Sequence, residues 1–395
     1  MMTAAKRLTE AREAKRDEFY TRYIDIQKEV EAYLEFDPDT FRDKVVYCNC
    51  DDPFESNFFK YFAANFNRLG LRKLITTSYD GSPIAGAQLT FSEYMDGNSG
   101  RQRPNAIAVE IEEVNDLNDD GARDIEDVRL FLEQNPHHRT CLLEGGDFRS
   151  EECVNLLRQA DIVVTNPPFS LFSEYVALLI EHGKKFLIIG NTNAITYKEV
   201  FPHIRENRLW LGCTNFNVGM FFEVPDDWEK FHHIDEQTGK KIARVSTSCW
   251  YTNLDHGRRH KPLNLMTMAD NLRYSPGLRG KAAYEKYDNY DAIEVSTYKE
   301  IPSDYDGVMG VPVTFLDKYS PEQFEIVGTL ESSEPDNPYR TRWYSAQDQK
   351  DAYFRRFGKP GSIPLNMSGV INDVKVFKRI LIRHRHHPDN SGSVK

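Results

Sequence analysis

Short apolar runs that alternate with helical patterns constrain the fold of this chain more than any other feature. Strands are predicted at 44–49, 74–78, 141–143, 162–165, 186–190, 208–211 and 220–224. Apolar residues at helical spacing predict helices over 10–33, 56–69, 123–134, 151–160, 171–182 and 197–206. Because strands this short and apolar are typical of βαβ units, we expect an α/β fold with a doubly wound, parallel sheet covered by helices on both faces.

The alternation changes at two places, which predict the domain organisation. The segment 80–119 is rich in Gly, Ser, Pro and Asn and contains two strand-like runs, 87–91 and 106–111, so we expect an inserted hairpin. After about two-thirds of the chain the alternation ends, and Tyr, Asp, Pro and Gly become frequent. A chain of 395 residues exceeds what one average domain needs. We therefore expect one domain over 1–254 and an α+β domain over 255–395.

The formal net charge is −11, whereas a protein that merely coats nucleic acid is basic. The acidic total hides two basic segments: 256–286 holds seven Lys and Arg residues against two acids, and 375–385 holds five with no acid. Both segments indicate contacts with phosphates, and an ordinary solvated face is the alternative. The candidate phosphate contacts in the first segment are Arg258, Arg259, Lys261, Arg273, Arg279 and Lys281.

Other features of the composition predict the compartment and the absence of a metal. The first fifteen residues lack the apolar run of a signal peptide, and no apolar run is long enough to span a membrane, so we expect a cytoplasmic protein. The six cysteines form no Cys-x-x-Cys pair, and the histidine doublets have no companions at zinc-ligand spacing. We expect reduced, mostly buried cysteines and no metal site.

The run Asn166-Pro167-Pro168-Phe169 carries the sharpest chemical signal. It follows a predicted strand and precedes a predicted helix, so it lies at the carboxyl end of a strand, where open α/β sheets bind ligands. The Asn166 amide oxygen and the Pro167 carbonyl can accept both hydrogens of an exocyclic amine such as adenine N6. The delocalised nitrogen lone pair is then freed for attack, and the developing charge is stabilised. Phe169 offers a stacking face for an extruded base, while the alternative is a rigid turn.

Several segments, in order along the chain, resemble the EcoRI-type DNA adenine-N6 methyltransferase family. The likeness is carried by 17–21 (DEFYT), 46–74 with YCNCDDP and SNFFKYF, Gly146-Asp147-Phe148, the Asn166 loop, 250–256 (WYTNLDH) and 379–383 (RILIR). It covers most of the chain. The resemblance implies a Rossmann-like, S-adenosylmethionine-dependent methyltransferase domain followed by a target-recognition domain that binds double-stranded DNA.

The resemblance implies a cofactor loop directly after the first predicted strand. Asp52, Pro53 and Phe54 occupy the place of that loop. Ser56 and Phe58 stand where glycines are common in the family, so the path of the backbone around S-adenosylmethionine differs from the usual one.

Other cofactor contacts follow from the same resemblance. Phe19-Tyr20-Thr21 resembles the motif that holds the methionine end of the cofactor, with Arg22 in place of a common proline. Asp80 would hold the ribose hydroxyls, Asp147 would accept from the adenine amine of the cofactor, and Phe148 would pack on its ring. Taken singly, each acid is equally well explained as a helix cap or turn residue.

The motif and the resemblance together predict a site-specific DNA adenine-N6 methyltransferase that acts on a base flipped out of the duplex. Asn166, Pro167, Pro168 and Phe169 would form its catalytic loop, and the basic segment 256–286 would hold the DNA backbone. We expect a monomeric modification enzyme of a restriction-modification or phage system. A cognate endonuclease would act on the same site without a stable complex.

Alternative activities use a similar loop. Cytosine-N4 methylation is the nearest, and RNA adenine or protein glutamine N-methylation would also fit. A cytosine-C5 enzyme needs a nucleophilic cysteine, typically after proline, and this sequence has no Pro-Cys pair. A catalytically idle DNA-binding protein would not need an intact Asn-Pro-Pro-Phe run, and no nuclease constellation is evident for a fused restriction enzyme.

Overall fold

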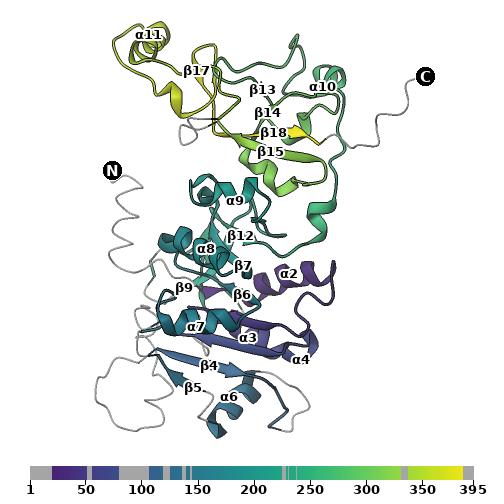
Figure 1. Cartoon of the computed structure of the whole chain (residues 1–395), viewed down its shortest axis with the longest axis vertical. Helices are drawn as coiled ribbons and strands as arrows, with labels where there is room; N and C mark the ends of the chain where they lie inside the picture. The colour runs from purple at the N-terminus through teal and green to yellow at the C-terminus, as the bar shows by residue number, and fades with distance from the viewer. Residues whose placement is uncertain are drawn as a thin grey trace, which may run out of the picture. The chain divides into compact units, whose positions relative to one another are not determined.

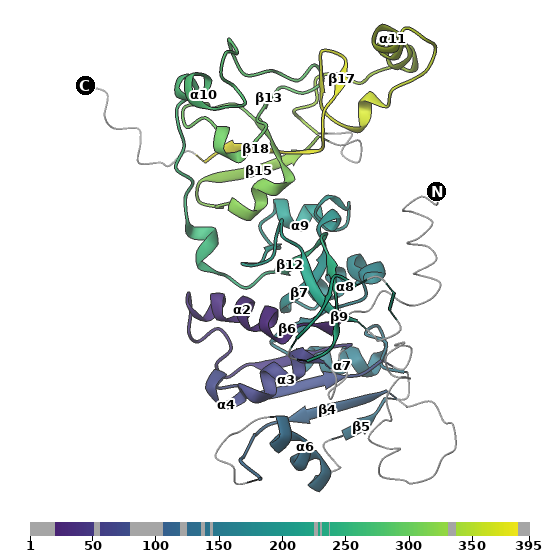
Figure 2. The same cartoon turned by 180° about the vertical axis from the view of Figure 1, so that it is seen from behind.

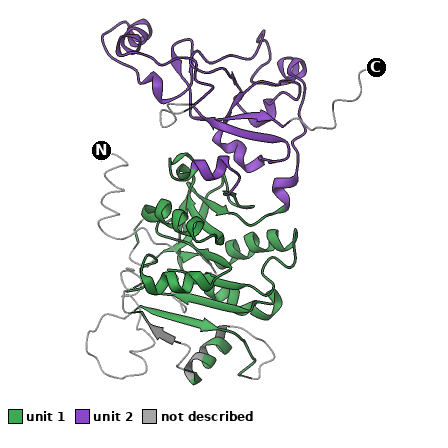
Figure 3. Cartoon of the chain, viewed as in Figure 1, with its two compact units in different colours: residues 1–200, 209–256 green, residues 201–208, 257–395 purple. Residues whose placement is uncertain are grey.

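The computed structural model describes residues 20–50, 56–79, 106–118, 125–135, 139–142, 145–224, 228–229, 231–236, 238–330 and 337–385. The chain forms two compact units (Figure 3): unit 1 comprises 1–200 and 209–256, and unit 2 comprises 201–208 and 257–395. Five predicted cofactor residues and one predicted strand lie outside the described residues: Phe19, Asp52, Pro53, Phe54, Asp80 and the strand at 87–91.

Unit 1 is built on an eight-stranded sheet with the order β5-β4-β3-β2-β6-β7-β12-β8. Its four central strands are parallel: β3 (Lys73–Thr77), β2 (Val45–Cys48), β6 (Ile162–Thr165) and β7 (Lys185–Asn191). Side chains of β2 and β6 are buried on both faces, as expected for parallel strands between two helical layers.

The outer strands of this sheet pair antiparallel with their neighbours, so the prediction of a parallel sheet was wrong at both edges. The outer strands are β4 (Ile107–Ile111), β5 (Arg139–Cys141), β12 (Ser248–Thr252) and β8 (Trp210–Leu211). An antiparallel neighbour needs no helical crossover, so the chain can add such strands at the edges after an insertion or a hairpin.

Helices cover both faces of the sheet (Figures 1 and 2). On one face Phe58 packs edge-on to Trp250, and on the other Phe172 packs against Tyr251, the next residue of β12. The first layer contains α2 (Tyr23–Leu34), α3 (Asn57–Ala64), α4 (Phe66–Leu69) and α6 (Ile125–Gln134), and the second contains α7 (Glu151–Gln159) and α8 (Phe172–Glu181).

A smaller antiparallel sheet in unit 1 has the order β1-β9-β11-β10. Its strands are β1 (Tyr20–Thr21), β9 (Met220–Val224), β11 (Lys241–Val245) and β10 (His233–Ile234). The helix predicted over 10–33 was wrong at Tyr20 and Thr21, because these residues pair with Glu223 and Phe222. The helix begins only at Tyr23, after the extended Arg22.

Unit 2 holds a four-stranded sheet with the order β13-β14-β18-β15 and a hairpin, β16-β17. The strands are β13 (Ile293–Glu294), β14 (Met309–Pro312), β15 (Phe324–Thr329), β16 (Val370–Ile371), β17 (Val374–Lys375) and β18 (Arg379–His384). The helices are α9 (Phe201–Arg205), α10 (Met268–Tyr274) and α11 (Ala346–Phe357), and short 3-10 turns connect the elements. The short strands explain why the sequence pattern in this region is irregular.

Three sequence-based expectations concern single residue types or the membrane. Cys48, Cys153 and Cys249 are buried, and the cysteines whose side chains are described are free thiols. Within the described ranges, His, Cys, Asp and Glu side chains form no cluster suited to a metal ion. The helices of the described segments include none that is long and apolar enough to cross a membrane.

Candidate active site

The Asn-Pro-Pro-Phe run leaves the central sheet at the end of β6. Asn166 is partly exposed with its Oδ1 atom buried, Pro167 is buried, and Pro168 and Phe169 are partly buried. The carbonyl of Pro168 accepts from the Leu171 amide at 2.9 Å, which starts the 3-10 turn η2 (Phe169–Leu171) and then α8. The loop therefore presents an amide side chain at the carboxyl edge of a parallel strand.

A buried polar network joins the ends of three parallel strands beside this loop. The hydroxyl of Thr165 donates to the main-chain carbonyl of Asn49, which follows β2. Thr77, at the end of β3, donates to the Asn49 side-chain oxygen at 2.9 Å and lies 3.0 Å from the Tyr47 hydroxyl. Because the Thr77 proton goes to Asn49, Tyr47 donates to Thr77, and burial raises the pKa of Tyr47 well above its usual value. The network fixes the strand ends that carry the predicted catalytic and cofactor loops.

Sequence reasoning assigned no role to the members of this network, although Thr165 directly precedes the Asn166 loop and Asn49 lies in the YCNCDDP segment. Asn49, Thr77 and Thr165 are 1%, 0% and 0% exposed, yet they are polar residues at the ends of otherwise apolar strands. Their polarity at that position is the signal that could have identified them, since buried polar side chains need partners.

A tight turn brings Asp147 to the same edge of the sheet. Gly146 has a φ of +72°, and a Cβ atom at that position would lie 2.0 Å from the Ser78 carbonyl oxygen, so only glycine fits. Ser78 follows β3 directly, and the turn thus passes over the end of that strand. The structure therefore places the turn that precedes Asp147 against Ser78.

The Asp147 carboxylate holds Arg149. The guanidinium Nε and Nη2 atoms donate at 2.9 and 2.7 Å, and Arg149 also contacts Glu174 at 3.1 Å. These hydrogen bonds lower the pKa of Asp147, so the carboxylate is ionised at neutral pH and keeps its capacity as an acceptor.

Phe148 points into unit 1 rather than toward solvent. Its ring is 3% exposed and packs edge-on to Tyr175 of α8, with centroids 4.9 Å apart. The Arg149 guanidinium lies 5.3 Å from the centroid of the same ring. In this structure the ring anchors the Asp147 turn to α8.

The N-terminal motif and the segment after the predicted cofactor loop lie together. The Asn57 side chain donates to the carbonyl of Thr21 at 2.8 Å, which connects β1 to the start of α3. Ser56 caps that helix by accepting from the Phe58 amide, and Phe58 is buried in the core. The two positions where the family commonly has glycine thus serve here as a helix cap and a core residue.

The six candidate phosphate contacts fall into two groups. Arg258 forms an ion pair with Asp317 at 2.9 Å, and Arg259 is only 6% exposed and donates to the Asn207 side chain at 2.5 Å. The others are exposed in unit 2: Lys261, Arg273, Arg279 and Lys281, the last paired with Glu285 at 3.0 Å. Arg258 and Arg259 have structural partners within unit 2, which sequence alone did not reveal.

Known proteins resemble this chain over most of its length. The family described as "Adenine-specific methyltransferase EcoRI" matches residues 7–385. The chain is 45% identical to the Type II methyltransferase M.EcoRI of Escherichia coli over 326 residues, which is 82% of this chain and 88% of that protein. It is 37% identical to M.MpnI of Mycoplasma pneumoniae, over 84% of this chain and 86% of that one, and 35% identical to M.MgeORF184P of Mycoplasma genitalium, over 84% and 87%.

No solved structure matches the chain at a significant level. The family match spans nearly all of the sequence, and three relatives above 30% identity are covered over most of their length. The chain therefore belongs to the EcoRI family of adenine-specific methyltransferases, and its substrate is DNA.

Proposed function

We propose that this protein transfers the methyl group of S-adenosylmethionine to N6 of an adenine that is flipped out of duplex DNA. The observation that carries the proposal is the Asn166-Pro167-Pro168-Phe169 loop, which leaves a central parallel strand in a chain of an adenine-specific family. Open α/β sheets bind their ligands at this edge.

The two units would have different roles, catalysis for unit 1 and target recognition for unit 2. Unit 1 has parallel central strands with helices on both faces, which supports a Rossmann-like catalytic domain. Unit 2 contains the exposed basic side chains of the segment 256–286, and we assign target recognition to it. The domain limits of 1–254 and 255–395 remain our proposal.

The residues at the carboxyl edge suit S-adenosylmethionine. Asp147 offers carboxylate oxygens to an amine or to hydroxyls, and β1 with Asn57 holds the N-terminal motif next to the segment after 51–55. We propose that Tyr20, Thr21 and Asp147, together with Phe19, Asp52, Pro53, Phe54 and Asp80, bind the cofactor, with Phe148 supporting Asp147 from the core. When bound, the cofactor supplies an electrophilic methyl group on a sulfonium.

The catalytic loop would activate the adenine amine. The Asn166 amide oxygen and the Pro167 carbonyl accept the two N6 hydrogens, which makes the nitrogen lone pair available. As N6 bonds to the methyl carbon, the bond from that carbon to the sulfonium sulfur would break and leave a neutral thioether. The positive charge on N6 is stabilised by the same two oxygens, and one amine proton is then lost to solvent. Phe169 stacks on the flipped base, and stacking with pocket hydrogen bonds offsets an unstacking cost of a few kcal/mol.

Relatives named Type II methyltransferases support a role in a restriction-modification system. We propose that this protein is the modification enzyme of such a system, acting as a monomer in the cytoplasm. A cognate endonuclease would recognise the same site without forming a stable complex with the methyltransferase.

Labelled methyl transfer into duplex DNA, followed by nucleoside analysis, tests the proposal. We expect all label in N6-methyladenine, at one short sequence. Label in N4-methylcytosine would show that cytosine N4, and not adenine N6, accepts the methyl group. Label only in RNA or protein would overturn the choice of DNA as the methyl acceptor.

A further inference from the structure

The helix α11 of unit 2 exposes large apolar side chains to solvent. Its twelve residues include one fully buried side chain, Ala352, whereas Phe354 and Phe357 are 58% and 50% exposed. In the segments before and after this helix, Trp343 and Phe377 are 56% and 82% exposed. Exposed aromatic residues that gather on one element commonly mark a binding surface.

Four of the exposed residues of α11 form one stripe. Gln347, Lys350, Phe354 and Phe357 are spaced three, four and three residues apart, so they lie along one side of a helix. With 100° of turn per residue, this side lies opposite Ala352, which faces the small core of Tyr344, Ile363, Leu365 and Val370. We call these four residues the outer face of α11.

The helix is well fixed at both ends, so its outer face is a defined surface. Ser345 and Asp348 form a capping box at the N-terminus, and Gly358 ends the helix in the left-handed conformation. α11 lies at the periphery of unit 2 in both views (Figures 1 and 2).

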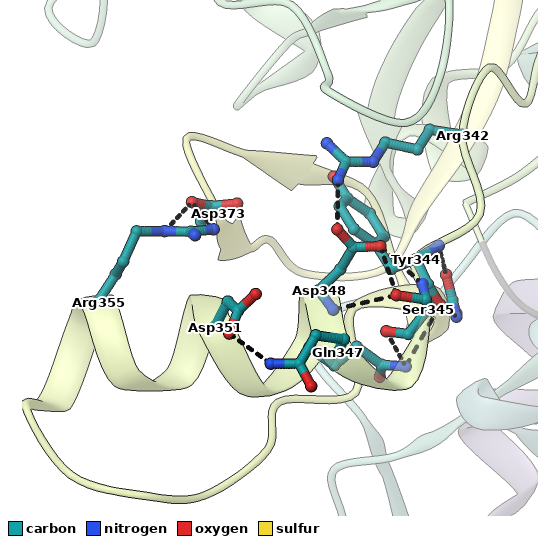
Figure 4. Close-up of polar contacts among 10 residues, drawn as sticks. Arg342, Tyr344, Ser345, Gln347, Asp348, Asp351, Arg355 and Asp373 are labelled. Atoms are coloured by element: carbon teal, nitrogen blue, oxygen red, sulfur yellow. Dashed lines mark hydrogen bonds and ion pairs between the residues drawn. The ribbon is translucent and has the colours of Figure 1, made fainter.

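The acidic residues around α11 are held by partners, as the close-up in Figure 4 shows. Asp348 accepts from Ser345 and pairs with Arg342 at 2.9 Å. Asp373 accepts from Arg355 at 2.8 Å, and Asp351 accepts from the Gln347 amide at 2.8 Å. Asp351 therefore orients the Gln347 side chain, whose Oε1 atom still has acceptor capacity.

The charge around the helix is opposite in sign to that of the whole chain. Residues 337–378 contain eight Lys and Arg residues against three Asp, although the chain carries a net charge of −11. Among the described residues no acidic group lies within ion-pair distance of Lys350 on the outer face. This surface is complementary to a polyanion.

We propose that the outer face of α11 enters the major groove of the substrate DNA and contacts base edges there. A twelve-residue helix is about 18 Å long, and the groove, about 12 Å wide, admits an α-helix. Gln347 carries the amide that pairs with adenine edges, Phe354 and Phe357 suit thymine methyl groups, and Lys350 suits a phosphate. The inference rests on the proposed function, because that function makes duplex DNA the substrate.

Two single substitutions on the full-length protein test this surface. Phe354→Ala removes an apolar base contact, and Lys350→Ala removes a charge, both at exposed positions. Phe231→Ala and Lys299→Ala are matched controls, since Phe231 is 40% exposed in unit 1 and Lys299 is exposed in unit 2. Binding is measured by fluorescence anisotropy over a salt series. One duplex contains the short sequence that the enzyme methylates, and the other has a mixed sequence without it. Thermal melting of each variant checks that it is folded.

Lys350→Ala is expected to weaken binding to both duplexes and to reduce the slope of log affinity against log salt by about one. Phe354→Ala is expected to weaken binding to the site-bearing duplex by roughly ten- to a hundredfold and to leave the mixed duplex unaffected. Both controls should bind like the unaltered protein.

If folded Lys350→Ala and Phe354→Ala proteins bind both duplexes as the unaltered protein does, the proposal is wrong, and a protein partner becomes the better occupant. Binding and methylation by the unaltered protein distinguish this result from a failure of the proposed function. If it binds duplex DNA but methylates none, the proposed function fails, while the salt series on the mixed duplex still decides whether α11 contacts DNA.

Discussion

The hydroxyl of Thr165 donates a hydrogen bond to the main-chain carbonyl of Asn49. Thr165 is the last residue of β6, directly before Asn166, and Asn49 follows β2, close to the predicted cofactor loop at Asp52. One side chain thus ties the strand that ends at the catalytic loop to the strand that ends at the cofactor loop. The two loops must keep a fixed position relative to each other, because transfer of a methyl group needs the donor and the acceptor aligned.

Replacing Thr165 by Val should slow methylation, because the side chain keeps its shape but loses its hydroxyl. The buried Asn49 carbonyl then lacks this donor, at a cost of about 1–3 kcal/mol in the free energy of unfolding. We expect kcat to fall about tenfold or more, with little change in the KM for DNA. Thr165→Ser keeps the hydroxyl and should restore kcat. Equal kcat values for Thr165→Val and the unaltered protein would show that the contact does not position the loop.

Glu29 should be a strong determinant of the stability of unit 1. It is fully buried in α2, where it accepts from the Cys213 amide at 2.6 Å and the Thr214 amide at 2.8 Å, and burial raises its pKa. In Glu29→Gln the side-chain NH2 group would face backbone donors, so the free energy of unfolding should fall by about 1–3 kcal/mol in urea titration. Glu31, which pairs with Arg68 at the surface, provides the control. Glu31→Gln should change the free energy of unfolding by less than about 1 kcal/mol. Equal effects of the two substitutions would contradict the structural role of Glu29.

Loss of the Arg259 side chain should reduce stability, whereas loss of the Arg279 side chain should reduce DNA binding. Arg259 is buried against Asn207, so Arg259→Ala should lower the free energy of unfolding by about 1–3 kcal/mol. Arg279 is exposed, so Arg279→Ala should leave stability unchanged but weaken DNA binding and reduce its salt slope by about one. Urea titration and binding over a salt series measure the two effects. An unchanged salt slope for Arg279→Ala would remove Arg279 from the DNA contacts.

The Asp147–Arg149 pair predicts a pH dependence. Arg149 lowers the pKa of Asp147 below 3.8, so the pair stabilises the folded state at pH values above 3.8. That contribution is lost as the pH falls through the lowered pKa. Arg149→Met should return the Asp147 pKa toward 3.8, and the stability difference from the unaltered protein should vanish at the most acidic pH. Carboxyl NMR titration measures the shift, and Arg158→Met, at an exposed position of α7, is the control. An Asp147 pKa that Arg149→Met leaves unchanged would contradict this assignment.

The central strands were predictable because their residues are apolar on both faces. The prediction at 162–165 coincides with β6, and that at 186–190 lies within β7. The strand directions at the sheet edges were not predictable, since β12 pairs antiparallel with β7 only after the intervening strands β9, β10 and β11 of the smaller sheet. Such long-range pairing leaves no periodic signal in the sequence.

The part of the candidate site that a sequence motif specifies was predictable. The roles of residues that depend on long-range contacts were not. The loop at Asn166 lies where the strand-to-helix pattern predicted it. The partners of Arg258 and Arg259, by contrast, are Asp317 and Asn207, and Asp317 is 59 residues along the chain from Arg258. Local charge counts could not distinguish such structural arginines from exposed ones.

Asn166→Ala tests the central claim most directly. The unaltered protein, Asn166→Ala and the surface control Asn155→Ala are incubated with labelled S-adenosylmethionine and duplex DNA, and the nucleosides are separated. We predict N6-methyladenine with the unaltered protein and the control, and none with Asn166→Ala, although that variant binds the cofactor with nearly unaltered affinity. Substantial N6-methyladenine from Asn166→Ala would contradict the proposed role of the loop.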